Sequence, residues 1–216
     1  MAVIAGSLSA AAQDFFDTSE PDQIFNLGVR IGVNTTNNTV DKNTYNIYNH
    51  NSWGTGFDLG VVGNINIRDY ISLQPGFFFE SRSGDFSYIS ALPDLAAGEN
   101  NLRMDVGHTL RYSFVIPIMA SVHFNISEDV RWDVEFGPYL AFNLKTNDDQ
   151  TFLATDDYKG IDLRHKGTDF GFKMGSGITI RRHFVVAAHY MAGCCDAWKD
   201  PMRNGRNKGW VFTAGY

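Results

Sequence analysis

The sequence of 216 residues has no uninterrupted apolar run close to the ~18 residues that a membrane-spanning helix needs. This absence excludes a helical membrane protein. The formal net charge is -6 and no Lys/Arg cluster occurs, which argues against a nucleic-acid binder. The two cysteines, Cys194 and Cys195, are adjacent and therefore build neither a disulfide framework together nor a spaced zinc-ligand set. We expect ordinary loop residues, with a vicinal disulfide in an oxidising compartment as the alternative.

Glycine and aromatic residues, by contrast, are plentiful. The chain has 21 Gly, 14% aromatic residues and only 19% charged residues, a composition typical of strands and turns. A membrane β-barrel is compatible with the low hydropathy, because each of its strands needs only about 9–11 residues and turns alternate positions to lipid.

The start of the chain resembles part of a secretory signal peptide. Residues 1–12, MAVIAGSLSAAA, are small and apolar, and end in the Ala-x-Ala pattern that signal peptidase accepts, although a basic region before them is missing. An acidic stretch follows. We therefore expect export, a periplasmic segment at 13–23 and one barrel domain at 24–216.

Apolar and polar residues alternate with a period of two, which indicates strands. In the first segment, apolar residues at 25, 27, 29, 31 and 33 alternate with polar or small residues. Eight segments show this pattern: 25–34, 53–67, 70–82, 110–124, 131–145, 168–180, 183–191 and 208–216. Pro75, Pro117 and Pro138 lie inside them and predict bulges, because proline removes a ladder hydrogen bond.

The connections between these segments alternate in length. Segments 2–3, 4–5 and 6–7 are joined by a few residues, and the others by roughly 15–25 polar residues, as in outer-membrane barrels with short periplasmic turns and long extracellular loops. The sequence therefore predicts an all-β, eight-stranded antiparallel up-and-down transmembrane β-barrel of a bacterial outer membrane. Its N-terminus would be periplasmic and four long loops extracellular. A soluble ligand-binding barrel, the alternative, has no reason to sort its loops this way.

Charged residues of both signs fall on the polar side of the alternation, where many glycines also lie. An eight-stranded barrel is only wide enough for side chains to fill it, so we expect a salt-bridged lumen in which His123 and His189 are hydrogen-bonded packing groups. An ion-conducting lumen is the alternative. The expected lumen charges are Arg30, Asp58, Glu80, Arg82, Arg111, Arg131, Asp133, Glu135, Lys145, Asp169 and Lys173.

Aromatic residues gather near the segment ends on the apolar side. They predict two girdles at the headgroup levels of the membrane. The girdle residues are Trp53, Tyr112, Phe124, Trp132, Phe184, Tyr190, Trp210 and Tyr216.

Short motifs spread over the strands resemble the PorT-like outer-membrane β-barrel family of Bacteroidota. They are Gly28-x-x-x-Gly32, Ile116-Pro117-Ile118, Gly137-Pro138-Tyr139, Asp169-Phe170-Gly171 and the ending Gly215-Tyr216. The resemblance covers about residues 24–216 and implies an eight-stranded outer-membrane barrel. Some relatives serve a protein-secretion system, so the resemblance also implies an accessory role in such a system as one candidate, and it brings no catalytic residues.

Candidate chemistry is sparse. His50, His108 and His165 are expected in or beside long loops, but no spacing matches a nucleophile or metal motif. Asp148, Asp149, Asp156 and Asp157 suit Ca²⁺ only as loose loop carboxylates. We therefore expect no catalytic residue, metal or cofactor, and a non-enzymatic structural or accessory barrel. The expected partners are outer-membrane lipid and other outer-membrane or periplasmic proteins, with no nucleic acid. A narrow channel and an enzyme with a site at the extracellular rim are the alternatives.

Overall fold

The computed structural model describes residues 15–39, 46–93, 100–153, 165–197, 199 and 205–216. Side-chain placement is described for these residues except 46–50, 86–93, 100–106 and 148–153. The signal peptide expected at 1–12 lies outside the described residues. In the described part of the chain, no helix has the length and apolar character needed to cross a membrane.

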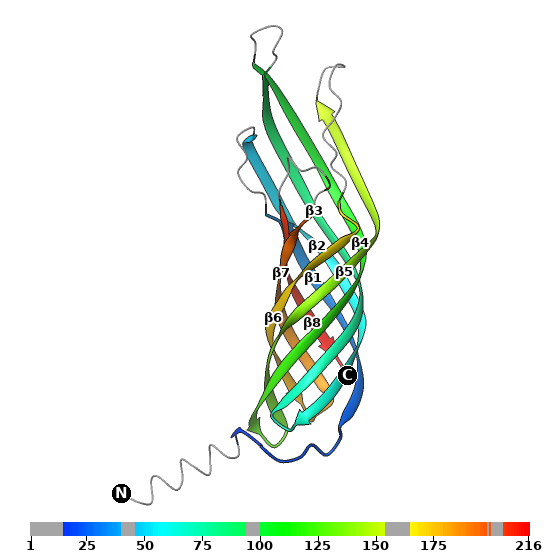
Figure 1. The fold of residues 1–216 in the computed structure, drawn as a ribbon, viewed down its shortest axis with the longest axis vertical. Helices are drawn as coiled ribbons and strands as arrows, with labels where there is room; N and C mark the ends of the chain where they lie inside the picture. The colour runs from blue at the N-terminus through cyan, green and yellow to red at the C-terminus, as the bar shows by residue number, and fades with distance from the viewer. Residues whose placement is uncertain (1–14, 40–45, 94–99, 154–164, 198, 200–204) are drawn as a thin grey trace, which may run out of the picture.

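Eight antiparallel strands follow one another around a closed barrel (Figure 1). They are β1 (Phe25–Asn38), β2 (Asn46–Arg68), β3 (Ile71–Pro93), β4 (Asn100–Ser127), β5 (Val130–Leu153), β6 (Thr168–Ile180), β7 (Phe184–Asp196) and β8 (Arg206–Gly215). Each strand pairs with the next, and β1 closes the barrel on β8 with Arg30 opposite Gly215. This order confirms the predicted eight-stranded antiparallel up-and-down barrel.

The barrel carries its apolar side chains on the outside. On β1, Ile31 and Val33 are each 60% exposed, whereas Asn34, on the lumen-facing side of the same strand, is 2% exposed. The same sorting recurs around the barrel, with Leu59, Phe136 and Phe212 on the exterior. An apolar exterior of this extent suits hydrocarbon rather than water, and it fits the predicted membrane barrel and not a soluble one.

Three short connections lie at one end, which we call the turn end. They join β2 to β3, β4 to β5 and β6 to β7, as predicted. The β6–β7 turn is tight: Arg181 and Arg182 have φ values of 51° and 58°, and the N–H of His183 donates to the carbonyl of Ile180 at 3.1 Å. Two successive positive φ angles usually require Gly or Asn, so this turn holds its arginines in a strained conformation.

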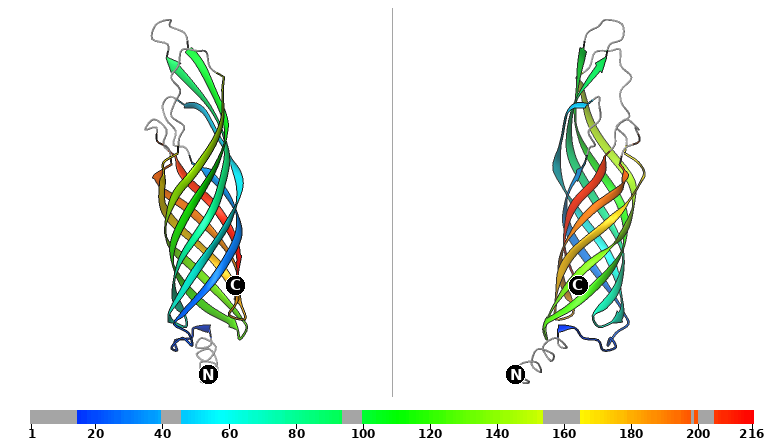
Figure 2. Two further views of the ribbon diagram at one scale, coloured as in Figure 1. Left: turned by 90° about the vertical axis from the view of Figure 1, so that its right-hand side faces the viewer. Right: turned by 60° about the vertical axis from the view of Figure 1, so that its left-hand side comes forward.

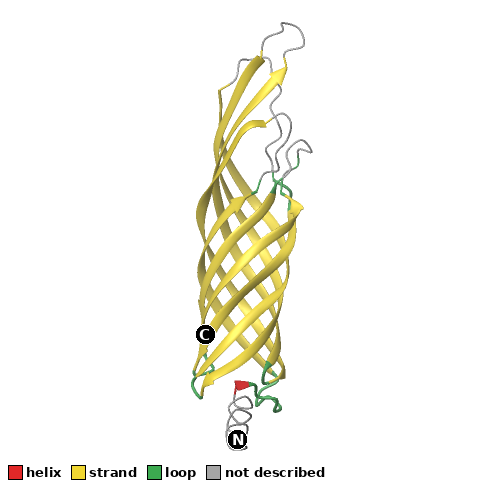
Figure 3. Cartoon of the chain, turned by 90° about the vertical axis from the view of Figure 1, so that its left-hand side faces the viewer, coloured by secondary structure: helices red, strands yellow, loops and turns green. Residues whose placement is uncertain are grey.

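The opposite end carries an extension of four strands, the projecting sheet. It comprises residues 46–53 of β2, 84–93 of β3, 100–109 of β4 and 145–153 of β5, and it rises above the other strands in all views (Figures 1, 2 and 3). Most of the predicted 15–25-residue loops are thus wrong: β3 and β4 are joined by 94–99 only. Polar residues such as Asp85 and His108 interrupt the apolar side of the alternation in this extension, so the predicted segments ended before it.

The expected bulges at Pro75, Pro117 and Pro138 are also wrong. Register is continuous past each proline, for example from Val62 opposite Gly76 to Ile65 opposite Leu73. Each proline lacks one donor toward one neighbouring strand, and the remaining bonds keep the register. Register shifts lie elsewhere, for example between Trp53 and Asp58, Tyr112 and Ser113, and Asn125 and Ser127.

Candidate functional site

The barrel interior is the candidate site, because strand alternation directs charged side chains from every part of the chain into it. Its upper layer centres on Arg82 and Glu80, two residues apart on β3 and therefore on the same face. Arg82 donates from Nε and Nη2 to Glu80 Oε2 at 3.0 and 2.8 Å. Arg82 Nη1 also lies 3.5 Å from Asp169 Oδ2 on β6, which accepts a hydrogen bond from Tyr139 at 3.0 Å. All four side chains are buried.

Asp58 and Lys173 belong to the same layer. Asp58 is opposite Glu80 in register and accepts a hydrogen bond from Asn34 Nδ2 at 2.8 Å. Lys173 is buried, with its Nζ 5.2 Å from the ring centroid of Phe78. A buried charge keeps its desolvation cost unless it is paired, so this layer depends on its partners across the lumen.

An apolar cluster lies inside the lumen and was missed by the sequence analysis. Its members are Val62, Phe78, Val115, Tyr139, Ala141 and Met191. Met191 is fully buried and its sulfur accepts a hydrogen bond from Arg82 at 3.3 Å, so the cluster contacts the charged layer. The signal that could have revealed this cluster was Phe78, an aromatic residue that falls on the polar side of β3 together with Gln74 and Glu80.

A second charged group, toward the turn end, centres on Glu135. Arg30 Nη2 lies 3.4 Å from Glu135 Oε1 and donates to Gln74 Oε1 at 3.1 Å. His189 Nε2 is hydrogen-bonded to Glu135 Oε2. This group links β1, β3, β5 and β7 across the barrel.

A third group links Ser72, His123 and Asp133. Ser72 Oγ lies 2.8 Å from His123 Nε2, and His123 Nδ1 lies 2.6 Å from Asp133 Oδ1, the order of nucleophile, base and acid in a hydrolase triad. Arg131 Nε and Thr179 Oγ1 also donate to Asp133. However, Ser72 is only 1% exposed and does not line the adjoining cavity. A nucleophile needs access to substrate, so this group fits a structural link between β3, β4 and β5.

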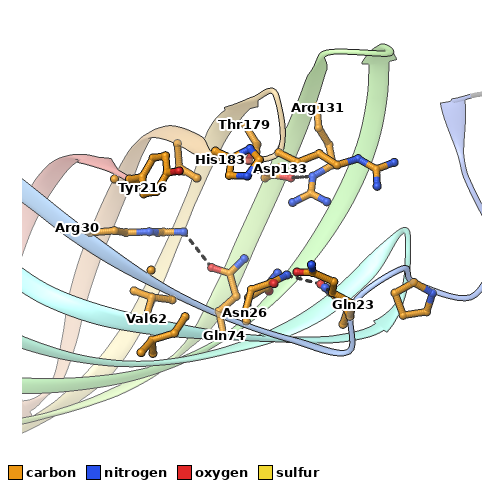
Figure 4. Close-up of a pocket in the computed structure, with 18 of the residues that line it drawn as sticks. Gln23, Asn26, Arg30, Val62, Gln74, Arg131, Asp133, Thr179, His183 and Tyr216 are labelled. Atoms are coloured by element: carbon orange, nitrogen blue, oxygen red, sulfur yellow. Dashed lines mark hydrogen bonds and ion pairs between the residues drawn. The ribbon is translucent and has the colours of Figure 1, made fainter.

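The turn end opens into a polar cavity of about 350 Å³ (Figure 4). Arg30, Gln74 and Asp133 line it, and Pro21, Asp22 and Gln23 of the N-terminal segment border it. Farther inside, the void between Arg30, Phe78 and His189 measures only about 10 Å³, roughly the smallest space that holds one water molecule. The lumen is therefore open at the turn end and packed in its middle.

Two of the expected lumen charges, Arg111 and Lys145, do not belong to the three charged groups described above. Arg111 donates to Asn207 Oδ1 at 2.9 Å near the opposite end of the lumen. Lys145 is exposed, so its lumen assignment is wrong. A register shift makes Ser113 pair with Asn143 but Tyr112 pair with Lys145, which leaves Leu144 as an extra residue. From Lys145 onward, the residues of β5 therefore face the side opposite to the one that simple alternation predicts.

Glycines on the inner face allow the strands to approach closely, as at Gly56 and Gly137. A Cβ atom would lie 1.8 Å from the carbonyl oxygen of Ser81 at Gly56 and 2.0 Å from that of Ile118 at Gly137. Any side chain at these positions would push neighbouring strands apart.

The expected girdle residues pair on the exterior. At the turn end, the ring centroids of Phe124 and Trp132 are 5.1 Å apart, and those of Phe184 and Tyr216 are 5.2 Å apart. Nearer the projecting sheet are Tyr190 and Trp210, 5.0 Å apart, Tyr112 stacked on Phe79, and Trp53, which lies 5.5 Å from Lys208 Nζ.

The N-terminal segment adds to the turn end in a way that the sequence analysis missed. Phe15 and Phe16 pack on Phe124, with centroids 5.2 and 5.0 Å away. Asp22 then forms an ion pair of 2.8 Å with Arg182. The acidic N-terminal segment is thus bound by an ion pair to the β6–β7 turn.

The expected loop histidines are distributed among strands and the barrel mouth. His50 lies in β2 and His108 in β4, and neither is in a loop. His165, before β6, is buried. Burial, with a smaller contribution from the charge of Arg111, holds the pKa of His165 well below its ordinary value. Cys194 and Cys195 are free and exposed at the end of β7, and Asp156 and Asp157 lie outside the described residues.

Comparisons with known proteins give the family. The sequence matches the outer membrane protein beta-barrel domain over residues 11–196. No curated protein sequence matches. Among solved structures, Ail of Yersinia pestis in complex with the heparin analogue sucrose octasulfate is similar at 15% identity and a TM-score of 0.41, covering 88% of this chain and 96% of that one.

Two other solved structures extend the comparison. Neisserial surface protein A has 10% identity and a TM-score of 0.41, covering 89% of this chain and 98% of its own. The COG4313 outer membrane channel from Pseudomonas putida F1 has 9% identity and a TM-score of 0.31, covering 93% and 98%. The chain belongs to the outer membrane protein β-barrel domain family.

Proposed function

We propose that this protein is a non-enzymatic, non-conducting barrel of a bacterial outer membrane that serves as a structural or accessory component for other envelope proteins. The observation that carries the proposal is the packed middle of the lumen. There, the cluster around Phe78 and Met191 adjoins the Arg82–Glu80 and Arg30–Glu135 pairs, and the nearby void is about 10 Å³.

The accessory role is supported by the projecting sheet. β1 ends at Asn38 and β6 begins at Thr168, so the upper parts of β2 and β5 extend beyond their neighbours on one side. Unpaired strand edges are surfaces on which other chains can add a strand. The resemblance to PorT-like barrels makes a protein-secretion complex one candidate assembly. We further propose that the turn end faces the periplasm and that the projecting sheet is extracellular.

The proposal is tested by reconstituting the barrel in planar bilayers. We expect no steady ohmic conductance, and Phe78→Ala with Met191→Ala should be needed before ions pass. A steady conductance of the unmodified barrel would contradict the proposal. Cross-linking in intact cells from a cysteine placed at Asn147, followed by mass spectrometry, should identify a partner at the projecting sheet.

A narrow channel is the second candidate, and the cavity of about 350 Å³ favours it because the lumen is already open at the turn end. If the middle layer rearranged under voltage, conductance would be gated rather than absent. Gly76→Phe, placed beside the void, would then abolish the gated current.

A further inference from the structure

The N-terminal segment crosses the turn end of the barrel instead of leading straight into β1. Residues 15–24 run beneath this end before β1 begins at Phe25 (Figures 1 and 3). Three of them, Pro21, Asp22 and Gln23, border the polar cavity of about 350 Å³ (Figure 4). We call residues 15–24 the strap, because they lie at the entrance of that cavity.

The end of the strap continues the β1–β2 ladder. The carbonyl oxygens of Gln23 and Ile24 accept hydrogen bonds from the side chain and the backbone N–H of Asn66, at 2.7 and 2.8 Å. The next residue, Phe25, is paired with Ile65 in the barrel wall. This end is therefore fixed, and any movement of the strap must turn about the residues before Ile24.

The start of the strap is held by aromatic contacts. Phe16 packs on Phe124 and Tyr70, with ring centroids 5.0 and 5.8 Å away, and Phe15 packs on Phe124 at 5.2 Å. Phe15 and Phe16 are nevertheless 39% and 38% exposed. Because apolar stabilisation scales with the area that is buried, these rings hold the strap less firmly than core packing would.

The middle of the strap is held by exposed ion pairs. Asp22 Oδ2 lies 2.8 Å from Arg182 Nη1, and Glu20 Oε1 lies 3.8 Å from Arg68 Nη1, with side chains that are 48–91% exposed. Ion pairs this exposed contribute little to stability and are screened by salt. Arg182 is also held at a φ of 58°, a strained conformation of the kind that clusters at ligand clamps and switch regions.

We propose that the strap is a releasable cover of the turn-end cavity. Residues 15–22 turn away about Gln23, and the cavity then admits hydrophilic solutes or peptide segments that are too large to pass beside the strap. The distribution of contacts supports this, because a segment that is fixed at one end and weakly held elsewhere opens from its weak end. The proposal goes beyond the proposed function and can fail separately from it, because it does not depend on whether the lumen conducts.

The experiment measures how fast a cysteine inside the cavity reacts with a bulky maleimide, using the full folded chain in detergent. Asn26→Cys is the reporter, because Asn26 lines the cavity and its side chain has no hydrogen bond to another described residue. Cys194 and Cys195 are exposed thiols, so both are first replaced by serine. If the bulky reagent reacts only while the strap is released, its rate is proportional to the released population.

Two variants should release the strap. Phe16→Ala should raise the rate of the bulky reagent about tenfold, because it removes contacts with two rings of the barrel. Asp22→Asn should raise it about two- to fivefold, the effect of losing one exposed ion pair. Added salt should accelerate the parent more than Asp22→Asn, because that variant has already lost an ionic contact.

Glu128→Gln is the matched control. It removes one acidic charge at the same end of the barrel, where Glu128 has no ion pair with a described residue, and it should leave the rate unchanged. A small thiol reagent passes beside the strap, so its rate should be equal in the parent and in every variant. Heat-modifiable gel migration shows that each variant remains folded.

Three outcomes would overturn the proposal. In the first, Phe16→Ala and Asp22→Asn react with the bulky reagent at the rate of the parent. In the second, Glu128→Gln accelerates that reaction as much as they do. In the third, the small reagent is accelerated to the same extent as the bulky one, which would show that the strap does not select by size.

Discussion

Within the barrel, β2–β5 present an apolar face to the outside and a polar face to the lumen, whereas in the projecting sheet the same strands carry polar side chains on the outside as well. Leu59 on β2 is 53% exposed on the barrel exterior, while Asp85 and His108 are exposed on the same side farther along the strands. The backbone ladder is similar in both regions. The difference shows that the alternation seen in a sequence records the medium around a strand rather than the strand itself.

The largest effect is expected in the lumen, where charges are buried. Glu80→Gln leaves Arg82 without its closest partner and should lower the free energy of unfolding by about 3–5 kcal/mol. The double variant with Arg82→Gln should lose less than the sum of the single losses, because neither charge then remains unpaired. Urea unfolding in lipid vesicles measures both.

An exposed ion pair supplies the control for this prediction. Arg68 and Glu20 approach to 3.8 Å at the surface of the turn end, so Glu20→Gln should change stability by less than about 1 kcal/mol. Equal losses for the lumen and surface variants would contradict the assignment of the lumen pair as a buried one.

A somewhat smaller effect should distinguish the exteriors of the two regions. Leu59→Arg places a charge in hydrocarbon and should cost about 2–4 kcal/mol near the bilayer centre. Asn147→Arg, on the exposed side of the projecting sheet, should stay within about 0.5 kcal/mol. If both substitutions cost the same in vesicle unfolding experiments, the two exteriors share one medium and the comparison fails.

The mouth between the two regions should respond to pH through His165. Its pKa is lowered in the folded state, so below the ordinary value of about 6.5 the unfolded chain binds one more proton than the folded chain. Stability is therefore fully present above that value and falls as the pH drops, by at most about 1.4 kcal/mol per pH unit. His165→Gln should flatten this part of the pH profile, and an unchanged profile would argue against a neutral buried ring.

The smallest effect is expected from shortening the projecting sheet. Replacing residues 87–106 by Asn-Gly keeps the pairs from Phe86 and Gly107 inward. The free-energy cost of closing a loop changes by only about 0.6 kcal/mol for each halving of its length. The shortened barrel should therefore stay folded and retain its heat-modifiable migration. Loss of the folded band would show that the projecting sheet supports the barrel.

Sequence alone determined the number of strands, their antiparallel order and the face that each strand presents to the outside. These features follow from the two-residue period of apolar residues and from the short turns between segments. The period is a local signal, which can be recognised in Phe25–Val33 from the sequence alone. It also placed Glu80, Arg82 and Asp169 on the polar side. The projecting sheet escaped it, because polar residues such as Asp85 and His108 interrupt the apolar side of the period there, although Leu102, Met104 and Val106 still alternate with polar or small residues.

Only the tertiary structure decided which side chains meet. Arg82 contacts Asp169 and Met191 across the lumen, and position 108 aligns with positions 85 and 149, because barrel closure and strand register set these neighbours. A single extra residue, Leu144, turned Lys145 outward. The apolar cluster around Phe78 likewise formed only when strands distant in sequence curved around one lumen. The alternation within each strand is set by its own sequence, whereas the register of that strand against its neighbours is set by closure of the barrel.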